Sequence, residues 1–160
     1  MVIGHFEAES DEYEKIRAVS SEDTDGIAGL LVKSYKINPA YKQIGSKEDY
    51  ILHVKEFLDE HKNNSIMDEA SRVVVDESTN NIVGVCLHME FEQYPLIMSL
   101  VVDPEHQKRG IGRYLLTHSI SSSDKEYPAT RLSVIRDNHA IKFYEDVGFI
   151  RNRSLTDMYL

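Results

Sequence analysis

The segment from Gln107 to Arg113 combines glycines and basic residues in a pattern that can bind an anion. An apolar stretch ends just before it, and a helical pattern begins within it. The first N–H groups of a helix have no carbonyl partners and lie at the positive end of the helix dipole, so they attract negative charge. Glycines at positions 110 and 112 let the backbone approach a ligand closely, because no Cβ intervenes. These features predict a site for phosphate groups.

The charge of this segment favours the same interpretation. Lys108, Arg109 and Arg113 lie together in a chain whose formal net charge is -9. The alternative is an ordinary strand-to-helix turn with solvated basic side chains. Two other phosphate motifs are excluded, because a P-loop needs GxxxxGK[ST], which is absent, and a dinucleotide fingerprint needs a small residue where this chain has Leu115.

A second segment that can do chemistry runs from Asp137 to Phe149, with the sequence DNHAIKFYEDVGF. Helical spacing gathers one face from Ala140, Ile141, Tyr144 and Val147. Tyr144 then brings a hydroxyl to a face that is otherwise apolar. It is either a core tyrosine with a satisfied hydroxyl or a proton donor, since a phenol with an ordinary pKa of about 10 remains protonated at neutral pH.

The composition restricts the class of protein. With 160 residues, 41% hydrophobic and 28% charged, the chain is typical of a soluble globular protein, and we expect a single domain over residues 1–160 with about ten frayed residues at its start. Nothing resembles a signal peptide or a run of about 18 apolar residues, which favours the cytoplasm. The single cysteine, Cys86, excludes an internal disulfide and a cysteine-based metal site.

The net charge also restricts the partners. An acidic chain repels nucleic acid and anionic membranes, so neither is expected as a partner. Cationic small molecules are better matched, and no metal is expected. A homodimer is left open.

The elements that position these segments follow from hydrophobic periodicity, capping residues and turn signals. The order is strand, two helices, three strands, helix, strand, helix and two strands, which predicts an α/β fold. We expect a mixed, largely antiparallel sheet of about seven strands, with about four flanking helices. The predicted strands are Ile16–Val19, Arg72–Val75, Ile82–Phe91, Leu96–Val102, Thr130–Ile135, Phe149–Arg153 and Leu155–Leu160. The predicted helices follow Ser20 and Ser46, and then span Arg109–Ser121 and Asn138–Val147, the last closed by Gly148.

The two chemical segments together resemble the GNAT acyltransferase superfamily. Gln107 to Gly112 is similar to its Q-x-x-G-x-G motif, and Asp137 to Phe149 resembles its second signature, an asparagine followed by a helix with a tyrosine and then Gly-Phe. The two signatures have the order and separation usual in that family. The resemblance covers roughly residues 16–160, strongly from 96 to 149 and loosely before 72. It implies acetyl-CoA as cosubstrate and a pair of parallel strands that splay apart.

The resemblance implies roles for particular residues. The pantetheine arm would lie along Leu100, Val101 and Val102, where a strand N–H can stabilise the oxyanion. The pyrophosphate would meet Gln107, Lys108, Arg109, Gly110, Ile111, Gly112 and Arg113. Tyr144 would protonate the departing CoA thiolate. Asn138 is one residue closer to Tyr144 than the asparagine of the family pattern is to its tyrosine. We favour Asn138 as the residue that contacts CoA. The alternative is that Asp137 takes the place of the family's asparagine; otherwise Asp137 caps the helix.

The general base is not assigned by the resemblance. Ribosomal-protein N-terminal acetyltransferases of this family carry a glutamate where this chain has Leu132 or Ser133, which disfavours that subclass. His88, Glu90 and Glu92 share one parity near a strand end, so each is a candidate, as is a water chain, and the alternative for each is a solvated strand end. Cys86 has the same parity, but we expect a small core residue rather than an acyl-cysteine.

The function implied by the resemblance is transfer of an acetyl group from acetyl-CoA to a primary amine by direct attack in a ternary complex. The alternative is a noncatalytic acyl-CoA-binding module with the same fold. A small molecule or a peptide bearing a cationic amine is expected as acceptor, because the chain is acidic. Tyrosines at 35, 41 and 50 either wall the acceptor pocket or pack in the core.

Overall fold

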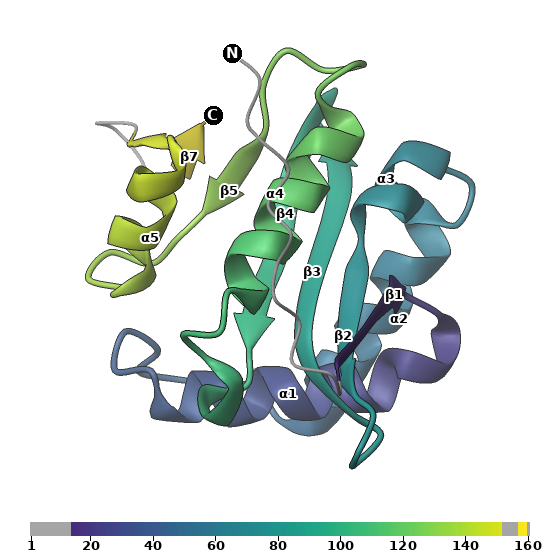
Figure 1. The fold of residues 1–160 in the computed structure, drawn as a ribbon, viewed down its shortest axis with the longest axis vertical. Coiled ribbons are helices and arrows are strands. Elements are labelled where there is room, and N and C mark those ends of the chain that lie inside the picture. Colours follow the sequence, from purple (N-terminus) through teal and green to yellow (C-terminus); the bar gives the residue numbers. More distant parts are fainter. Residues whose placement is uncertain (1–13, 152–156, 160) are drawn as a thin grey trace.

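The computed structural model describes residues 14–151 and 157–159, and Figure 1 shows how their elements are arranged. The helices in this part of the chain are α1 (Thr24–Ile37), α2 (Lys47–His61), α3 (Ser65–Ala70), α4 (Ile111–Ser123) and α5 (Ala140–Val147), with short 3-10 helices η1 (Ser21–Asp23) and η2 (Pro104–His106). The strands are β1 (Glu14–Ala18), β2 (Arg72–Asp76), β3 (Asn81–Phe91), β4 (Tyr94–Val102), β5 (Arg131–Ser133), β6 (Ile150–Arg151) and β7 (Asp157–Tyr159). None of these helices is long and apolar enough to cross a membrane.

The strands form one sheet in the order β1-β2-β3-β4-β5-β7-β6. Neighbouring strands are antiparallel, except that β4 and β5 run parallel and pair at Leu96 with Arg131 and at Ile97 with Leu132. Within the described residues, the pairing of β4 with β5 ends at Ile97, although β4 continues to Val102 beside β3. The two parallel strands diverge from there (Figure 1). The predicted sheet and its splayed parallel pair are confirmed.

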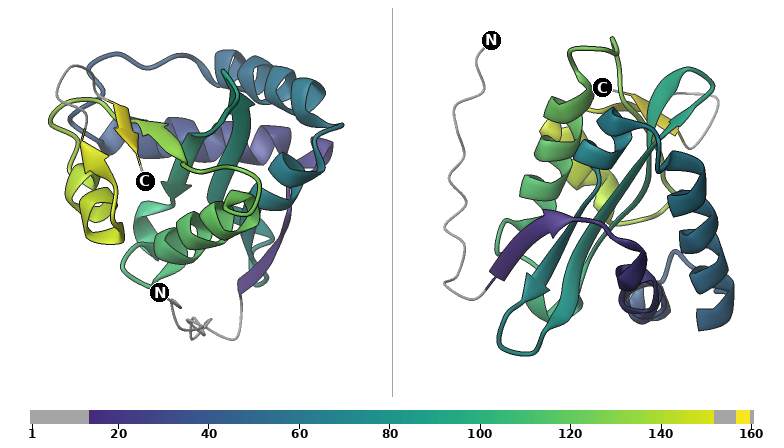
Figure 2. Two further views of the ribbon diagram at one scale, coloured as in Figure 1. Left: turned by 90° about the horizontal axis from the view of Figure 1, so that it is seen from above. Right: turned by 90° about the vertical axis from the view of Figure 1, so that its right-hand side faces the viewer.

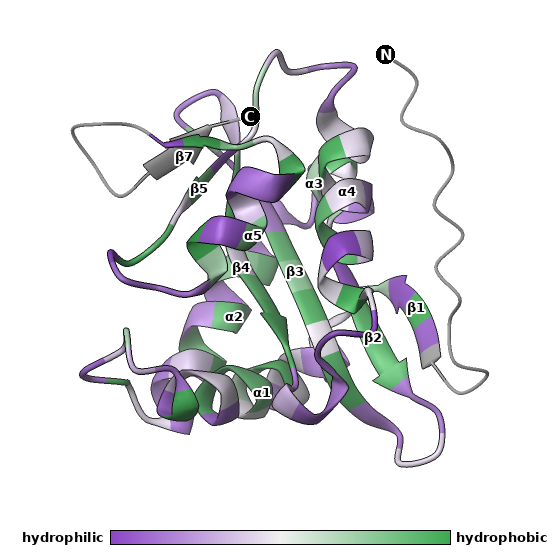
Figure 3. Ribbon diagram, turned by 60° about the vertical axis from the view of Figure 1, so that its left-hand side comes forward, coloured by the Kyte–Doolittle hydropathy of each residue, from purple (hydrophilic) through white to green (hydrophobic). Residues whose placement is uncertain are grey.

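Helices cover both faces of the sheet. Figure 2 shows α4 and α2 on opposite sides of the strands, and Figure 3 shows hydrophobic residues along β2, β3 and β4. Two cores result, because successive strand residues point to opposite faces. One core packs β2 and β3 against α1 and α2, through Ile27, Leu31, Val54, Phe57, Val73, Val85 and Leu87. The other packs the opposite face against α4 and α5, through Val74, Cys86, Ile97, Leu115, Leu116, Leu132 and Tyr144.

A bulge interrupts the pairing of β3 with β4. Leu87 pairs with Ser99, but the next residue, His88, pairs with Ile97, so Met98 is an extra residue on β4. A bulge of this kind lets two successive side chains point to the same side of a sheet. Both Met98 and Ser99 line a cleft on the α1 and α2 face.

Most predicted elements are present, with shifted ends. Two predicted helix ends are observed: the Ser46 hydroxyl accepts a 3.1 Å hydrogen bond from the N–H of Asp49, and Gly148 closes α5 in a left-handed conformation. The helix predicted directly after Ser20 begins at Thr24, because residues 21–23 form the 3-10 helix η1. Helix α3 was not predicted, because six residues are too few to establish a helical period, and it raises the number of α-helices in the described part of the chain to five. The strand predicted over Thr130–Ile135 is limited to Arg131–Ser133, since Val134 and Ile135 lead into the turn before α5. The last two predicted strands lie partly outside the described residues.

Candidate active site

The turn between β4 and α4 has the backbone geometry of an anion site. Lys108 and Gly110 both have positive φ, at 64° and 87°, so the chain turns sharply just before α4 begins at Ile111. Gly110 is the N-cap residue, so no side chain caps the first amides of α4, and the first turn contains no acidic residue. Uncapped helix amides without a neighbouring carboxylate are available to an anionic ligand.

The two glycines of this turn serve different purposes. Gly110 is needed for its conformation, because an L-residue rarely adopts a φ of 87°. Gly112 does not have this constraint, and a Cβ there would make only ordinary contacts, 3.5 Å from Val102 and 3.9 Å from Phe143. The protein's own packing therefore does not require glycine at position 112, whereas a phosphate held against the backbone would. Residues 107–113 are called the cradle below.

The start of the cradle is tied back to β4. The Gln107 side-chain amide donates a 3.2 Å hydrogen bond to the carbonyl of Val102, the last residue of β4. Gln107, Lys108, Arg109 and Arg113 are exposed, whereas Ile111 is buried in the core. Along β4, Val101 is buried on the α1 and α2 side, and Leu100 and Val102 pack toward α4 and α5.

Tyr144 on α5 is a core tyrosine by packing. Only 9% of it is exposed, and its ring lies 5.4 Å from the ring of Phe143 and 6.0 Å from that of Phe149. Burial raises the pKa of its hydroxyl above the ordinary value of 10, and Cys86 and Tyr41 act in the same direction. The phenol is therefore protonated at any physiological pH, as a proton donor must be.

A cleft of about 280 Å³ lies on the other face of the sheet, between α1, α2 and the middle of β4. Its aromatic wall contains Tyr35 and Tyr50, whose ring centroids are 5.8 Å apart. Two carboxylates on α2, Glu56 and Glu60, lie at its border, one helical turn apart and solvent-exposed. Neither has an ion-pair partner among the described residues. The cleft therefore combines aromatic rings with two exposed carboxylates, and His53 and His61 line it as well.

Tyr41 connects this cleft to Tyr144. Its ring stacks on that of Tyr35 at a centroid distance of 4.2 Å, and its charge acts with burial to raise the pKa of Tyr144. Burial is the main cause that raises the pKa of Tyr35, while a hydrogen bond with Ser99 of the bulge opposes it. The end of α1 and the turn before α5 are joined directly, because the Asn38 side-chain amide donates a 3.4 Å hydrogen bond to the Asn138 side-chain oxygen.

Comparison with known proteins identifies the family to which this chain belongs. The model of the acetyltransferase (GNAT) domain matches residues 40–157, which is more than half of the chain. This chain belongs to the GNAT family. The match includes the cradle, β4, the bulge and Tyr144.

Individual GNAT relatives resemble this chain only in part or only in fold. A 55-residue stretch is 38% identical to the ribosomal protein bS18-alanine N-acetyltransferase of Escherichia coli, and it covers 33% of this chain and 37% of that enzyme. The chain thus spans little more than a third of the relative's length. A PaiA N-acetyltransferase of Thermoplasma acidophilum, solved with coenzyme A, has a TM-score of 0.65 at 20% identity and covers 91% of this chain and 96% of that one.

A third relative, the solved ribosomal-protein-S18-alanine N-acetyltransferase of Escherichia coli, has a TM-score of 0.61 at 17% identity, over 87% of this chain and 79% of that one. At such identities the solved structures establish the fold that is shared.

The asparagine of the second signature is turned into the protein. Asn138 is 8% exposed, and its side-chain oxygen accepts hydrogen bonds from the N–H of Ala140 at 3.0 Å and from the amide of Asn38 at 3.4 Å. The side chain of Asn138, and not that of Asp137, therefore accepts a hydrogen bond from a backbone N–H at the start of α5. Asp137 is exposed and has a φ of 71°. The contact between Asn138 and CoA stays a prediction.

The three candidate bases on and after β3 are not brought to the cleft. His88 is fully buried under α4, where its Nδ1 lies 2.6 Å from the Ser119 hydroxyl. Glu90 accepts a hydrogen bond from the Tyr127 hydroxyl, and Glu92 lies in the β3–β4 turn, 3.5 Å from Arg131. Burial lowers the pKa of His88 to about 4, although a hydrogen bond with Ser119 opposes this effect.

Cys86 has the properties of a core residue. Its side chain is 0% exposed, and burial raises the pKa of its thiol to about 12, against the effect of a hydrogen bond with Ser119. A thiol in this state is neither a nucleophile nor a metal ligand at neutral pH. No group of three or more metal-binding side chains occurs in residues 14–151 and 157–159.

Proposed function

We propose that this GNAT protein transfers an acetyl group from acetyl-CoA to a primary amine by direct attack in a ternary complex. The observation that carries the proposal is the contact between the end of α1 and the turn before α5. The stacked pair Tyr35 and Tyr41 lies beside an open cleft, and the hydrogen bond from Asn38 to Asn138 joins the end of α1 to the turn before α5, the helix that carries Tyr144. A donor bound from one face and an amine bound from the other would meet there.

CoA is held by backbone groups in this proposal. The free amides at the start of α4 take the pyrophosphate, aided by the positive charge of Lys108, Arg109 and Arg113. The pantetheine arm then follows β4 along Val102, Val101 and Leu100, which leave unpaired backbone beside the gap. The thioester thereby reaches the level of Ser99, about 10 Å from Val102 at the usual rise of a strand.

The chemical step uses few side chains. The neutral amine nitrogen attacks the thioester carbonyl, and an N–H of β4 stabilises the oxyanion. The C–S bond then breaks as the Tyr144 hydroxyl protonates the sulfur, and the proton that the new amide nitrogen loses returns through water to the Tyr144 phenolate, which restores the phenol. Before the attack, the acceptor ammonium loses a proton to water in the cleft and becomes a neutral amine. Water takes this proton because His88, Glu90 and Glu92 lie elsewhere. Uncatalysed loss of this proton is favoured at high pH, so activity should rise as the acceptor amine deprotonates.

We propose a cationic amine as acceptor, either a small molecule or a peptide. The support is the pair of exposed carboxylates, Glu56 and Glu60, at the border of an aromatic cleft. Carboxylates at the border of the cleft attract a positively charged acceptor. The acceptor's reacting amine can then extend along the cleft to Ser99. The ribosomal-protein subclass remains disfavoured, since Leu132 is a buried core residue and Ser133 is not an acid.

The test is release of free CoA thiol from acetyl-CoA with a panel of amines, amino acids, polyamines, aminoglycosides and peptide N-termini. The proposal predicts turnover with at least one cationic acceptor and little with anionic ones. Tight binding of acetyl-CoA with no thiol release across the whole panel would instead support a noncatalytic acyl-CoA-binding module. A panel in which only neutral or anionic acceptors react would contradict the cationic acceptor alone.

A further inference from the structure

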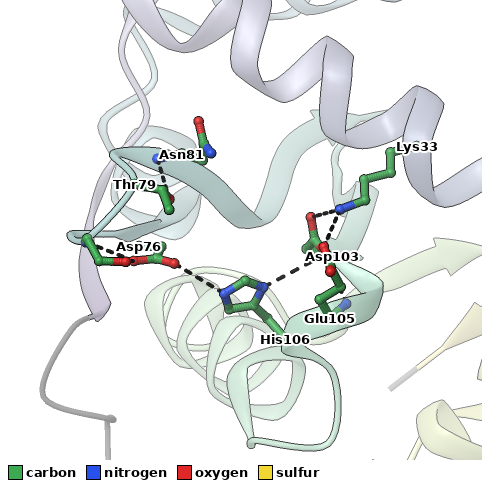
Figure 4. Close-up of polar contacts among 8 residues, drawn as sticks. Lys33, Asp76, Thr79, Asn81, Asp103, Glu105 and His106 are labelled. Atoms are coloured by element: carbon green, nitrogen blue, oxygen red, sulfur yellow. Dashed lines mark hydrogen bonds and ion pairs between the residues drawn. The ribbon is translucent and has the colours of Figure 1, made fainter.

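Helix α1 is joined by ion pairs to the turn that precedes the cradle. Lys33 on α1 lies with its Nζ 2.7 Å from Oδ2 of Asp103 and 2.9 Å from Oε2 of Glu105 (Figure 4). Asp103 directly follows β4, and Glu105 lies in η2, which leads into Gln107. A side chain from the cleft side of the sheet therefore contacts the segment that starts the CoA site.

Asp103 organises this turn with both of its oxygens. While Oδ2 meets Lys33, Oδ1 accepts a 2.9 Å hydrogen bond from the N–H of Glu105 and so caps η2. The backbone of Asp103 is fixed as well, since its N–H donates to the carbonyl of Val83 at 2.7 Å and its carbonyl accepts from the N–H of His106 at 2.8 Å. Asp103 is only 8% exposed, so its carboxylate depends on these partners.

A second anchor holds the other end of η2. The His106 ring lies between two carboxylates, with Nε2 3.4 Å from Oδ2 of Asp76 and Nδ1 3.8 Å from Oδ1 of Asp103 (Figure 4). Asp76 ends β2 and is itself fixed by the hydroxyl and the N–H of Ser78. The segment before the cradle is thus held between α1 on one side and the β2–β3 turn on the other.

We propose that Lys33 is a positioning residue for CoA: by compensating Asp103 it keeps η2, and hence the amides of the cradle, in the geometry that binds pyrophosphate. The inference rests on the proposed function, because it concerns the same CoA site. A backbone cradle has no side chain that can adjust to a displaced ligand, so its affinity depends on how well its amides are fixed in advance. Without Lys33, the buried carboxylate of Asp103 turns toward water and releases the N–H of Glu105.

The first experiment compares CoA affinity by calorimetry in Lys33→Met and in a matched control, Lys47→Met. Lys47 also forms an ion pair from an α-helix, 2.9 Å from Asp25, and its side chain is 42% exposed against 46% for Lys33, but it contacts no part of η2. We expect Lys33→Met to weaken CoA binding by roughly 10-fold to 100-fold, as for other residues that orient a binding group. Lys47→Met should bind CoA like the unchanged protein, and Lys33→Arg should retain most of the affinity.

The decisive variant is Asp103→Asn, because two explanations predict opposite results. If Lys33 acted only through its positive charge near the phosphates, removing the negative charge of Asp103 would tighten CoA binding. In the positioning account, Asp103→Asn weakens CoA binding, and the double variant with Lys33→Met is little worse than either single one. The KM for the acceptor should change less than that for acetyl-CoA.

Several outcomes separate this inference from the proposed function. Equal CoA affinity in Lys33→Met and the unchanged protein would overturn the positioning role, as would tighter binding by Asp103→Asn. If Lys33→Met does not fold, Glu105→Gln and Asp103→Asn give the same comparison, and tighter CoA binding in both would overturn the role. Failure of the unchanged protein to bind CoA would overturn the proposed function itself, and the inference with it.

Discussion

The cradle proposed for CoA and the cleft proposed for the acceptor use different parts of the chain. The cradle is one continuous segment, residues 107–113, and its binding groups are backbone amides exposed by a left-handed turn at Gly110. The cleft takes its side chains from α1, α2, β3 and β4, which are far apart in sequence. A ligand common to a family suits a site built from backbone, whereas a ligand that differs between members suits a site built from exchangeable side chains.

The largest effect is expected where the two regions meet, at Tyr144. Tyr144→Phe keeps the ring contacts with Phe143 and Phe149 and removes only the hydroxyl. If the phenol protonates the leaving thiolate, the lost interaction belongs to the transition state, so kcat should fall by roughly 10²-fold to 10⁴-fold while the Kd for CoA stays constant. Single-turnover measurement of acetyl transfer separates chemistry from product release, and an unchanged chemical step in the Phe variant would leave Tyr144 as a core residue.

A substitution inside the cradle should impair CoA binding without altering the cleft. Gly112→Glu places a negative charge within about 6 Å of the expected pyrophosphate, which at an effective dielectric constant near 20 corresponds to roughly 100-fold weaker CoA binding. Gly112→Ala is the matched control, because the added Cβ meets Val102 only at 3.5 Å and introduces no charge. Calorimetric titration with CoA measures both. Similar affinities in Gly112→Glu and Gly112→Ala would show that the phosphates lie elsewhere.

The buried His88 allows a pH effect on folding to be separated from a pH effect on the acceptor amine. Its pKa is about 4 in the folded protein and 6.5 ordinarily, so the unfolded chain takes up a proton first and stability falls as the pH drops below 6.5. At pH 5 the loss relative to pH 7 should be about 2 kcal/mol. Urea unfolding of the unchanged protein and of His88→Gln measures this difference. Parallel pH profiles between pH 7 and 5 would mean that His88 does not titrate as described.

The smallest effect is expected from the carboxylates of the cleft. Exposed charge pairs contribute at most about 1 kcal/mol, so Glu56→Gln or Glu60→Gln should lower kcat/KM for a cationic amine by roughly 2-fold to 5-fold, with the KM for acetyl-CoA unchanged. Asp59→Asn is the control, because Asp59 lies on the same helix and does not line the cleft. An equal decrease in all three variants would indicate a general effect of charge, and no decrease in any would remove α2 from acceptor recognition.

The contrast between the two regions also explains what the sequence could predict. Local signals locate the cradle: glycines at 110 and 112, clustered basic residues and the change from an apolar strand to a helix all lie within one short segment. The helix start after Ser46 and the glycine that closes α5 are equally local signals, and both predictions are confirmed. Backbone conformation depends on neighbours in the chain, so a single sequence contains much of the information.

The cleft could not be predicted, because it depends on tertiary contacts. Glu56 and Glu60 have the spacing of any solvated helix face, and only the packing of α2 beside β4 makes them border a cleft. The bulge at Met98 leaves no clear trace in an apolar strand, although it directs Met98 and Ser99 to the same side. Parity on β3 correctly grouped His88 and Glu90, yet it could not reveal that their face is covered by α4 and the loop after it.

The most direct test is two-dimensional NMR of the 15N-labelled protein, which follows its backbone amide signals while unlabelled ligands are added. Addition of CoA should shift the amide signals of Lys108 to Arg113 and of Leu100 to Val102, and should leave those of α2 nearly unchanged. Subsequent addition of an amine that supports thiol release should shift signals of α2, from Tyr50 to Glu60, and of Ser99. Shifts of α2 on addition of CoA, with the cradle signals unmoved, would contradict the division of the two ligands between cradle and cleft.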